Sequence, residues 1–144
     1  MKYTKFVHNF LEDSAEQFPA KPALFANGNW HTYQEINEKA NQLAHYFLEL
    51  GIHKGDRVAL LIENSFEYVA TYYAILKVGA ITVALNTDST ADDVAYILED
   101  CTVALLVTNQ KLLKKIQTLF SGVGDQSKRV KKNISKVFDR FQHI

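Results

Sequence analysis

The side chains that could do chemistry in this chain lie far apart in the sequence. Histidine, a common metal ligand, occurs five times, and no two histidines keep the short spacing that protein metal sites use. These residues are His8, His31, His45, His53 and His143. We interpret His45, which lies beside an apolar stripe, as a packed or surface residue. The sequence predicts no metal site.

The single cysteine, Cys101, follows Asp100 at the end of a predicted helix. A reactive thiolate needs a basic neighbour, and none is identifiable near Cys101 in the sequence. We therefore interpret Cys101 as an unreactive thiol and predict no catalytic residue. One cysteine also allows no internal disulfide, which fits a reducing, cytoplasmic compartment.

Three turns that follow apolar segments are the places where a nucleotide could bind. A dinucleotide fold needs glycines there, so that backbone N–H groups can approach a pyrophosphate. The turns read ENSFEY, NTDSTADD and TNQKLL, and none contains glycine. Asp92 and Asp93 also place two carboxylates at a predicted helix N-terminus, where they would repel a phosphate. We predict that these turns are structural and bind no cofactor.

Glu63 and Asn64 follow the first of the apolar segments, where ligands often bind in α/β folds. We interpret both as capping or loop residues, with a ligand-binding role as the alternative.

The elements that would position these residues are strands and helices in alternation. Three runs are short, continuously apolar and rich in branched side chains, as strands buried on both faces of a parallel sheet are. These predicted strands span residues 57–62, 80–85 and 103–107. The predicted helices between and after them span residues 66–78, 91–100 and about 110–120. Ser65 and Thr90 are the expected N-caps, and Gly79 ends the first of these helices.

The N-terminal part is predicted to hold a helix, a hairpin and a second helix. Phe6, Phe10, Leu11 and Phe18 lie mostly at helical spacing, which predicts an amphipathic helix over residues 5–17. Asn27-Gly28 between two strand-like runs predicts a hairpin turn. Thr32 and Glu35 form a capping box for the second helix, which Gly51 ends. That helix is predicted to bury Ile36, Ala40, Leu43, Ala44 and Phe47.

The predicted fold class is α/β: an open layered sheet with parallel βαβ units, an N-terminal helix and hairpin, and a C-terminal basic helix. Residues 1–110 carry 7 Lys/Arg and 14 Asp/Glu, whereas residues 111–144 carry 9 Lys/Arg and 2 Asp/Glu. The formal net charge of zero therefore hides an acidic body and a basic tail. We expect two parts, an N-terminal subdomain over residues 1–110 and a basic amphipathic helical tail over residues 111–144.

The tail has three interpretations. Val130, Ile134, Val137, Phe138 and Phe141 would share one face of a helix over residues 128–141. The helix could dock this face on the sheet, it could bind an acidic membrane or a partner groove, or the segment could be disordered. The cationic residues of the membrane interpretation are Lys128, Arg129, Lys131, Lys132, Lys136 and Arg140. No known nucleic-acid-binding motif accompanies these charges, so nucleic acid is not the expected partner.

An ordered set of motifs resembles the opening of adenylate-forming enzymes, the superfamily of acyl-CoA synthetases, luciferases and peptide-synthetase adenylation domains. The motifs are TYQEIN, GIHKGDRVAL, NSFEYVATYYAILKVGA, and YILED before ALLVT, and the resemblance covers about residues 5 to 110. Within the superfamily, ALLIENSFEYVAT and VALN lean towards fatty-acyl-CoA ligases of the transporter type. Where the family commonly has prolines after the strand ending at Val83, this chain has Ala84, Asn86 and Thr87.

The resemblance implies activation of a carboxylate by ATP and magnesium, and transfer of the acyl group to a thiol such as coenzyme A. The family's Ser/Thr/Gly-rich ATP loop, which ends in Pro-Lys-Gly, and its catalytic lysine have no matching positions here. Gly122, Gly124 and Ser127 lack the threonine pair and the Pro-Lys-Gly of that loop. We therefore expect an N-terminal fragment of an acyl-activating ligase that is inactive alone and is completed by another polypeptide. The alternative is a non-catalytic interaction module that self-associates or binds a partner through its sheet edge and basic tail.

Overall fold

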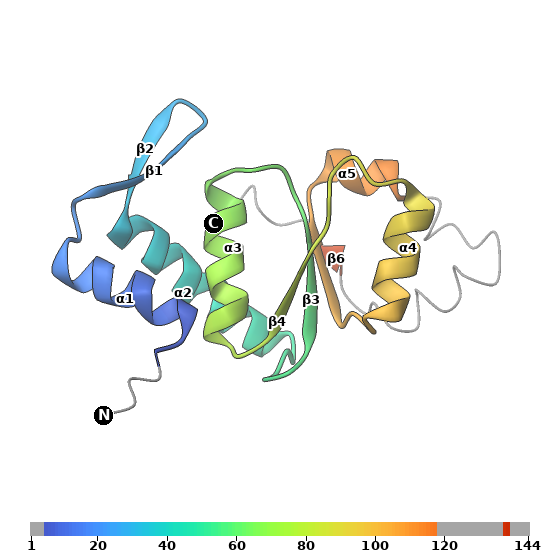
Figure 1. Cartoon of the computed structure of the whole chain (residues 1–144), viewed down its shortest axis with the longest axis horizontal. Coiled ribbons are helices and arrows are strands. Elements are labelled where there is room, and N and C mark those ends of the chain that lie inside the picture. Colours follow the sequence, from blue (N-terminus) through green and yellow to red (C-terminus); the bar gives the residue numbers. More distant parts are fainter. Residues whose placement is uncertain (1–4, 118–136, 139–144) are drawn as a thin grey trace. The chain divides into compact units, whose positions relative to one another are not determined.

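The structure is a computed structural model that describes residues 5–117 and 137–138 (Figure 1). It divides into two compact units. Among the described residues, the first unit contains the chain up to His53 together with Asn64–Gly79. The second unit contains Lys54–Glu63 and the residues from Ala80 onwards.

The first unit consists of three helices and a hairpin. Its elements are α1 (Val7–Gln17), β1 (Pro22–Ala26), β2 (Asn29–Thr32), α2 (Tyr33–Glu49) and α3 (Phe66–Lys77). The two strands are antiparallel and pair Phe25 with Trp30. Asn27 and Gly28 both have positive φ, 51° and 82°, which is the conformation that the tightest hairpin turns need. The prediction of a hairpin at Asn27-Gly28 is confirmed.

Helix α2 begins at the predicted capping box. The backbone N–H of Thr32 donates to Glu35 Oε2 over 2.7 Å, and the backbone N–H of Glu35 donates to Thr32 Oγ1 over 3.2 Å. All five residues predicted to be buried are buried in the structure. Gly51 follows the helix with φ 80°, as a left-handed C-terminal cap requires.

Helix α1 confirms the predicted helix but exposes most of its apolar residues. Leu11 packs with Ile36 and Ala40 in the core of this unit. Phe6, Phe10 and Phe18 are instead 63%, 58% and 52% exposed. One edge of the apolar surface of α1 is therefore buried, and the rest faces solvent.

The second unit is a parallel sheet with helices after two of its strands, which confirms the predicted α/β fold class. Its elements are β3 (Arg57–Leu61), β4 (Ile81–Ala84), α4 (Ala91–Asp100), β5 (Leu105–Thr108), α5 (Gln110–Lys115) and β6 (Val137–Phe138). The strand order is β4-β3-β5-β6, and every neighbouring pair is parallel. Strand β3, the first strand of this sheet in the sequence, therefore lies inside the sheet, between β4 and β5.

Burial differs among the strands because of that order. Val58, Ala59 and Leu60 of β3 are fully buried, as are Leu105 and Leu106 of β5. Strand β4 pairs with β3 alone among the described strands, and its first residue, Ile81, is 52% exposed. The prediction of burial on both faces is thus confirmed for β3 and β5 and wrong for β4, which lies at the edge of the sheet that the described residues form.

The predicted helix over residues 128–141 is wrong at two positions. Val137 and Phe138 form strand β6, whose register pairs them with Leu106 and Val107 of β5. Both residue types favour strands, and pairing with β5 satisfies their backbone groups. The remainder of that segment, including its basic residues, lies outside the described residues, and so do Gly122, Gly124 and Ser127. The division at residue 110 stays a prediction.

Candidate functional site

The carboxyl ends of the three longer parallel strands meet at one edge of the second unit, where ligands bind in many α/β proteins. Glu63 follows β3, the loop of residues 85–90 follows β4, and Asn109 follows β5. This carboxyl edge is the candidate site, because it gathers polar side chains from three separate parts of the chain.

Glu63 joins two of these parts. Its Oε2 accepts a hydrogen bond from Asn109 Nδ2 over 2.5 Å, and its Oε1 accepts one from Lys111 Nζ over 3.1 Å. The hydrogen bond from its own backbone N–H and the bond from Lys111 hold the pKa of the Glu63 carboxyl below its ordinary value. The carboxylate is ionised and already bound on both oxygens.

Asn109 and Lys115 complete the internal bonding of the edge. Asn109 Oδ1 accepts from the backbone N–H of Leu112 over 2.9 Å, so Asn109 is the N-cap of α5. Lys115 Nζ donates to the backbone carbonyl of Thr87 over 2.6 Å, which ties α5 to the loop after β4. The capping or loop role predicted for Glu63 thus fits its contacts, since Glu63 binds Asn109, the N-cap of α5.

The N-terminus of α4 also lies in this unit, and it is acidic. The backbone N–H of Thr90 donates to Asp93 Oδ2 over 3.1 Å, and that of Asp93 donates to Thr90 Oγ1 over 3.2 Å. Hydrogen bonds from the Thr90 side chain and backbone lower the pKa of Asp93. A second carboxylate, Asp92, lies in the same turn.

The donors at the carboxyl edge contact oxygen atoms of the chain itself: Asn109 Nδ2 and Lys111 Nζ donate to Glu63, and Lys115 Nζ donates to the Thr87 carbonyl. The Lys111 side chain is 83% exposed, and its ammonium group has three donors. The α4 N-terminus adds negative charge where an anion would otherwise bind. Within residues 5–117, moreover, no group of three or more His, Cys, Asp or Glu side chains could hold a metal ion. The bonds of Glu63, Asn109 and Lys115 have a structural role at this edge, and the absence of a cofactor from these turns stays a prediction.

At the amino ends of the strands, the contacts of Arg57 correct one expectation about Cys101. The sequence shows no basic neighbour, but Arg57 Nε donates to the Cys101 backbone carbonyl over 2.8 Å. The same guanidinium donates to the carbonyls of Gly55 and Thr102, each over 3.1 Å, and to Thr102 Oγ1. Arg57 contacts the backbone at the end of α4 rather than the thiol, so its role is to cap the helix.

The histidines are not brought together in the described part of the chain. His31 stacks on Phe66 with ring centroids 4.3 Å apart, and His8 stacks on Phe6 at 5.7 Å. His45 is exposed, as one of its two predicted placements allows. His143 lies outside the described residues.

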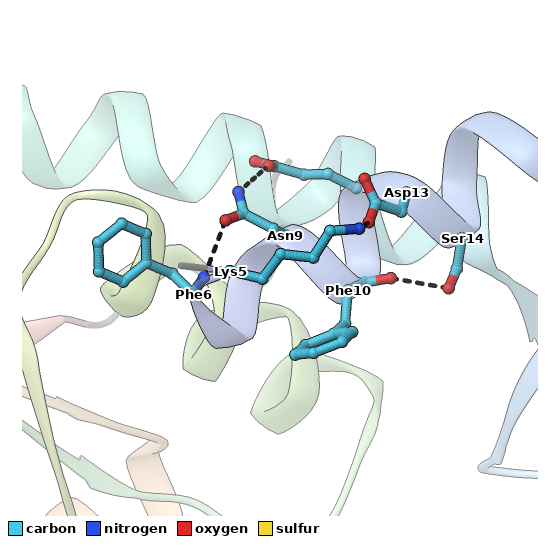
Figure 2. Close-up of polar contacts among 7 residues, drawn as sticks. Lys5, Phe6, Asn9, Phe10, Asp13 and Ser14 are labelled. Carbon is cyan, nitrogen blue, oxygen red and sulfur yellow. Dashed lines mark hydrogen bonds and ion pairs between the residues drawn. The ribbon is translucent and has the colours of Figure 1, made fainter. Parts of the chain in front are cut away.

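A further polar network fixes α1 within the first unit. Figure 2 shows Asn9 accepting from the backbone N–H of Phe6, and Asn9 Nδ2 donates to Glu12 Oε2 over 2.9 Å. Glu12 Oε1 pairs with Lys77 Nζ of α3 at 2.5 Å, and the Lys77 side chain is only 8% exposed. Burial raises the pKa of Glu12, but the hydrogen bonds from Lys77 and Asn9 outweigh it, so the net shift is downward.

Sequence reasoning missed Asn109, Lys111 and Lys77 as bonding partners. The capping role of Asn109 could have been predicted from the sequence, since an asparagine between a buried strand and a helix is a frequent N-cap. The contacts of Lys111 and Lys77 could not have been predicted, because their partners are 48 and 65 residues away in the sequence.

An α/β unit with a parallel sheet, preceded by a helix, a hairpin and a capped helix, defines the fold class. The family model for the AMP-binding enzyme matches residues 11–142. The chain belongs to the AMP-binding enzyme family, and the resemblance to the adenylate-forming superfamily is confirmed.

Curated relatives agree with this assignment. The chain is 34% identical over 120 residues to tyrocidine synthase 1 of Brevibacillus parabrevis. This match covers 83% of this chain and 11% of that protein. It is 37% identical over 106 residues to surfactin synthase subunit 1 of Bacillus subtilis, covering 74% of this chain and 3% of that protein. The chain thus spans a small part of the length of these relatives.

Solved structures match more of the chain. An inhibitor-bound N-terminal domain of FACL13 from Mycobacterium tuberculosis is 28% identical with a TM-score of 0.85, covering 94% of this chain and 33% of that one. The anthranilate CoA ligase AuaEII, in complex with anthranoyl-AMP, is 28% identical with a TM-score of 0.80, covering 90% and 24%. In both, the matched stretch is a minor part of a longer chain.

Proposed function

We propose that this chain supplies the N-terminal α/β platform of an adenylate-forming ligase, an enzyme that activates a carboxylic acid with ATP and transfers the acyl group. The observation that carries the proposal is the family match over residues 11–142. The TM-score of 0.85 to the N-terminal domain of FACL13 supports the same placement within a larger enzyme.

The described residues serve this function as a scaffold. The carboxyl-edge donors are bound to Glu63, Thr87 and the start of α5, so the edge is held in one geometry. Groups that bind ATP, magnesium and coenzyme A would be supplied by another part of the enzyme. We propose that the 144-residue chain does not form an acyl-adenylate by itself.

A finer proposal concerns the kind of acid that the enzyme activates. The similarity to CoA ligases of solved structure supports the fatty-acyl-CoA synthetase branch, whereas the identity to tyrocidine and surfactin synthases supports activation of amino acids. We propose the fatty-acyl branch, on the resemblance of ALLIENSFEYVAT and VALN to fatty-acyl-CoA ligases.

A complementation experiment tests both levels. Residues 1–117 would replace the matching stretch of a fatty-acyl-CoA ligase and, separately, of a peptide-synthase adenylation domain, and ATP–pyrophosphate exchange would be measured. We expect activity in the fatty-acyl chimera and none from the 144-residue chain alone. Folded chimeras that are inactive in both hosts would contradict the platform role. Activity restricted to the amino-acid host would contradict only the fatty-acyl branch.

A second candidate function is a non-catalytic interaction module. The observation that favours it is the edge strand β4, whose sequence ITVA contains no lysine, proline or other edge-protecting residue. An extended segment of a partner could pair with this edge. Light scattering of the chain over a wide range of concentrations would test self-association through this edge. A clean monomer throughout, or self-association that persists after Thr82→Pro, would contradict it, because proline removes an edge donor.

Two further expectations concern the chain's surroundings. The acidic-membrane role of the tail depends on residues outside the described ones and stays a proposal, as does a cytoplasmic location. Within the described residues, no helix combines the length and apolar character needed to cross a membrane. Flotation with acidic vesicles at low salt tests the tail, and absence of binding would end the membrane interpretation.

A further inference from the structure

Helix α1 has two apolar sides, and the first unit buries the smaller of them. Leu11 packs with Ile36 and Ala40 in the core of the unit. Phe6 and Phe10 are instead 63% and 58% exposed, and their spacing of four residues places both rings on one side of the helix. Burial of these two rings would remove more apolar surface from water than burial of Leu11 does. Apolar burial alone therefore does not explain which side of α1 faces the core.

A polar contact on the other side of Leu11 holds α1 to α3. Glu12 Oε1 pairs with Lys77 Nζ over 2.5 Å, and the Lys77 side chain is only 8% exposed. Asn9 Nδ2 donates to the second carboxylate oxygen, Glu12 Oε2, over 2.9 Å. Figure 2 shows that Asn9 also accepts from the backbone N–H of Phe6. Asn9 thus joins the start of the helix to the ion pair.

Helical geometry makes this ion pair incompatible with burial of Phe10. Successive residues of an α-helix are about 100° apart, so Phe10 and Glu12 project to opposite sides of Leu11. A rotation of α1 by about 100° would bring Phe10 into the position of Leu11. The same rotation would carry the Glu12 carboxylate away from Lys77. The ammonium of Lys77 would then be buried without its acid, and an unpaired buried charge is strongly unfavourable.

We propose that the Glu12–Lys77 ion pair selects the side of α1 that is buried, and that the helix rotates to bury Phe10 when the pair is removed. The pair acts as a conformational switch between two packings of one helix. With the pair in place, Leu11 is inside and the phenylalanine side faces solvent. Fixing one helix register against its alternatives is the best-attested use of a buried polar group. The inference is independent of the catalytic role proposed above.

Lys77→Met tests the proposal on the full chain, because methionine removes the buried charge and keeps an apolar side chain of similar length. Hydroxyl-radical footprinting measures the solvent access of Phe10. Amide hydrogen exchange over residues 7–17 reports whether α1 stays docked, because an undocked helix of this length loses its protection. We expect a protected helix and a severalfold loss of Phe10 labelling. The matched control is Lys5→Met, which removes the exposed pair with Asp13 and should leave the labelling of Phe10 unchanged.

Reversal of the ion pair separates selection of a side from simple attachment of the helix. Glu12→Lys combined with Lys77→Glu restores two opposite charges, so Phe10 should return to solvent and be labelled as in the unaltered chain.

Urea unfolding of Phe10→Ala gives an independent measurement. In the unaltered chain the ring is exposed, so this change should leave the unfolding midpoint where it is. In the Lys77→Met background the ring is expected to be buried, so the same change should lower the midpoint by about 1 M urea or more.

Four results would overturn the proposal. The first two concern Lys77→Met: unchanged labelling of Phe10, or loss of the hydrogen-exchange protection of α1. The third is a Phe10→Ala midpoint shift of the same size in both backgrounds. The fourth is a Phe10 ring that stays protected from labelling in the chain with the reversed pair.

Discussion

Replacing Arg57 by leucine should destabilise the second unit more than any other single surface change that we can identify in the described residues. The guanidinium donates to two backbone carbonyls and one hydroxyl at the junction of α4 and β5, and to the Gly55 carbonyl in the loop before β3. It also neutralises the negative end of the α4 dipole. Thr102, one of its partners, is held at φ 46°, a strained conformation for a β-branched residue.

The magnitude follows from the burial of each bond. The bond to the Cys101 carbonyl is partly buried, and a hydrogen bond from a charged donor in such a site contributes about 1.5 kcal/mol or more. The bonds to Gly55 and Thr102 are exposed, so water replaces them and each contributes about 0.5 kcal/mol. We expect Arg57→Leu to lower the free energy of unfolding by about 2–3 kcal/mol, which lowers Tm by roughly 10 °C.

Urea unfolding followed by far-UV circular dichroism measures this loss. Arg57→Lys keeps the charge but not the planar fork, so it should lose about half as much free energy. Lys54→Leu, which removes a nearby exposed cation, should change the free energy by less than about 0.5 kcal/mol. A loss below about 0.5 kcal/mol for Arg57→Leu would refute the assignment of Arg57 as the cap of this junction.

Three other changes test local features. Thr32→Ala removes the acceptor for the Glu35 N–H and should cost about 1 kcal/mol in urea unfolding; a neutral result would contradict the capping box. Gly28→Ala places a side chain at φ 82° and should cost about 1 kcal/mol, whereas Gly28→Asn should cost less, and equal losses would count against the turn geometry. Glu63 has a lowered pKa, so its stabilising effect is complete above the unfolded-state value of about 4.3 and is lost as pH falls through the folded value. Glu63→Gln should therefore flatten the acid side of the stability profile, and an unchanged profile would show that the hydrogen bonds from its own backbone N–H, Lys111 and Asn109 do not stabilise the ionised Glu63 carboxylate.

Local signals in the sequence predicted most of the elements. The Thr32–Glu35 box, the Ser65 cap and the Asn27-Gly28 turn each act within four residues, and each is confirmed. Such residues set backbone conformation directly, so no knowledge of the remaining chain is needed.

The contacts that the sequence left open are non-local. Arg57 reaches Cys101 across 44 residues, and Asn109 reaches Glu63 across 46. Both contacts follow from the pairing of β3 with β5, and three apolar strands do not reveal which of them is central. The exposure of Ile81 has the same cause, because an apolar strand at the edge of a sheet has the same composition as one inside it.

The central claim is that this chain provides the scaffold of an adenylate-forming enzyme without a triphosphate site of its own. Isothermal titration of the 144-residue chain with ATP and magnesium tests it most directly. The account predicts no saturable binding up to about 1 mM nucleotide. Saturable binding with a micromolar dissociation constant, weakened by changes at Glu63 or Asn109, would contradict it.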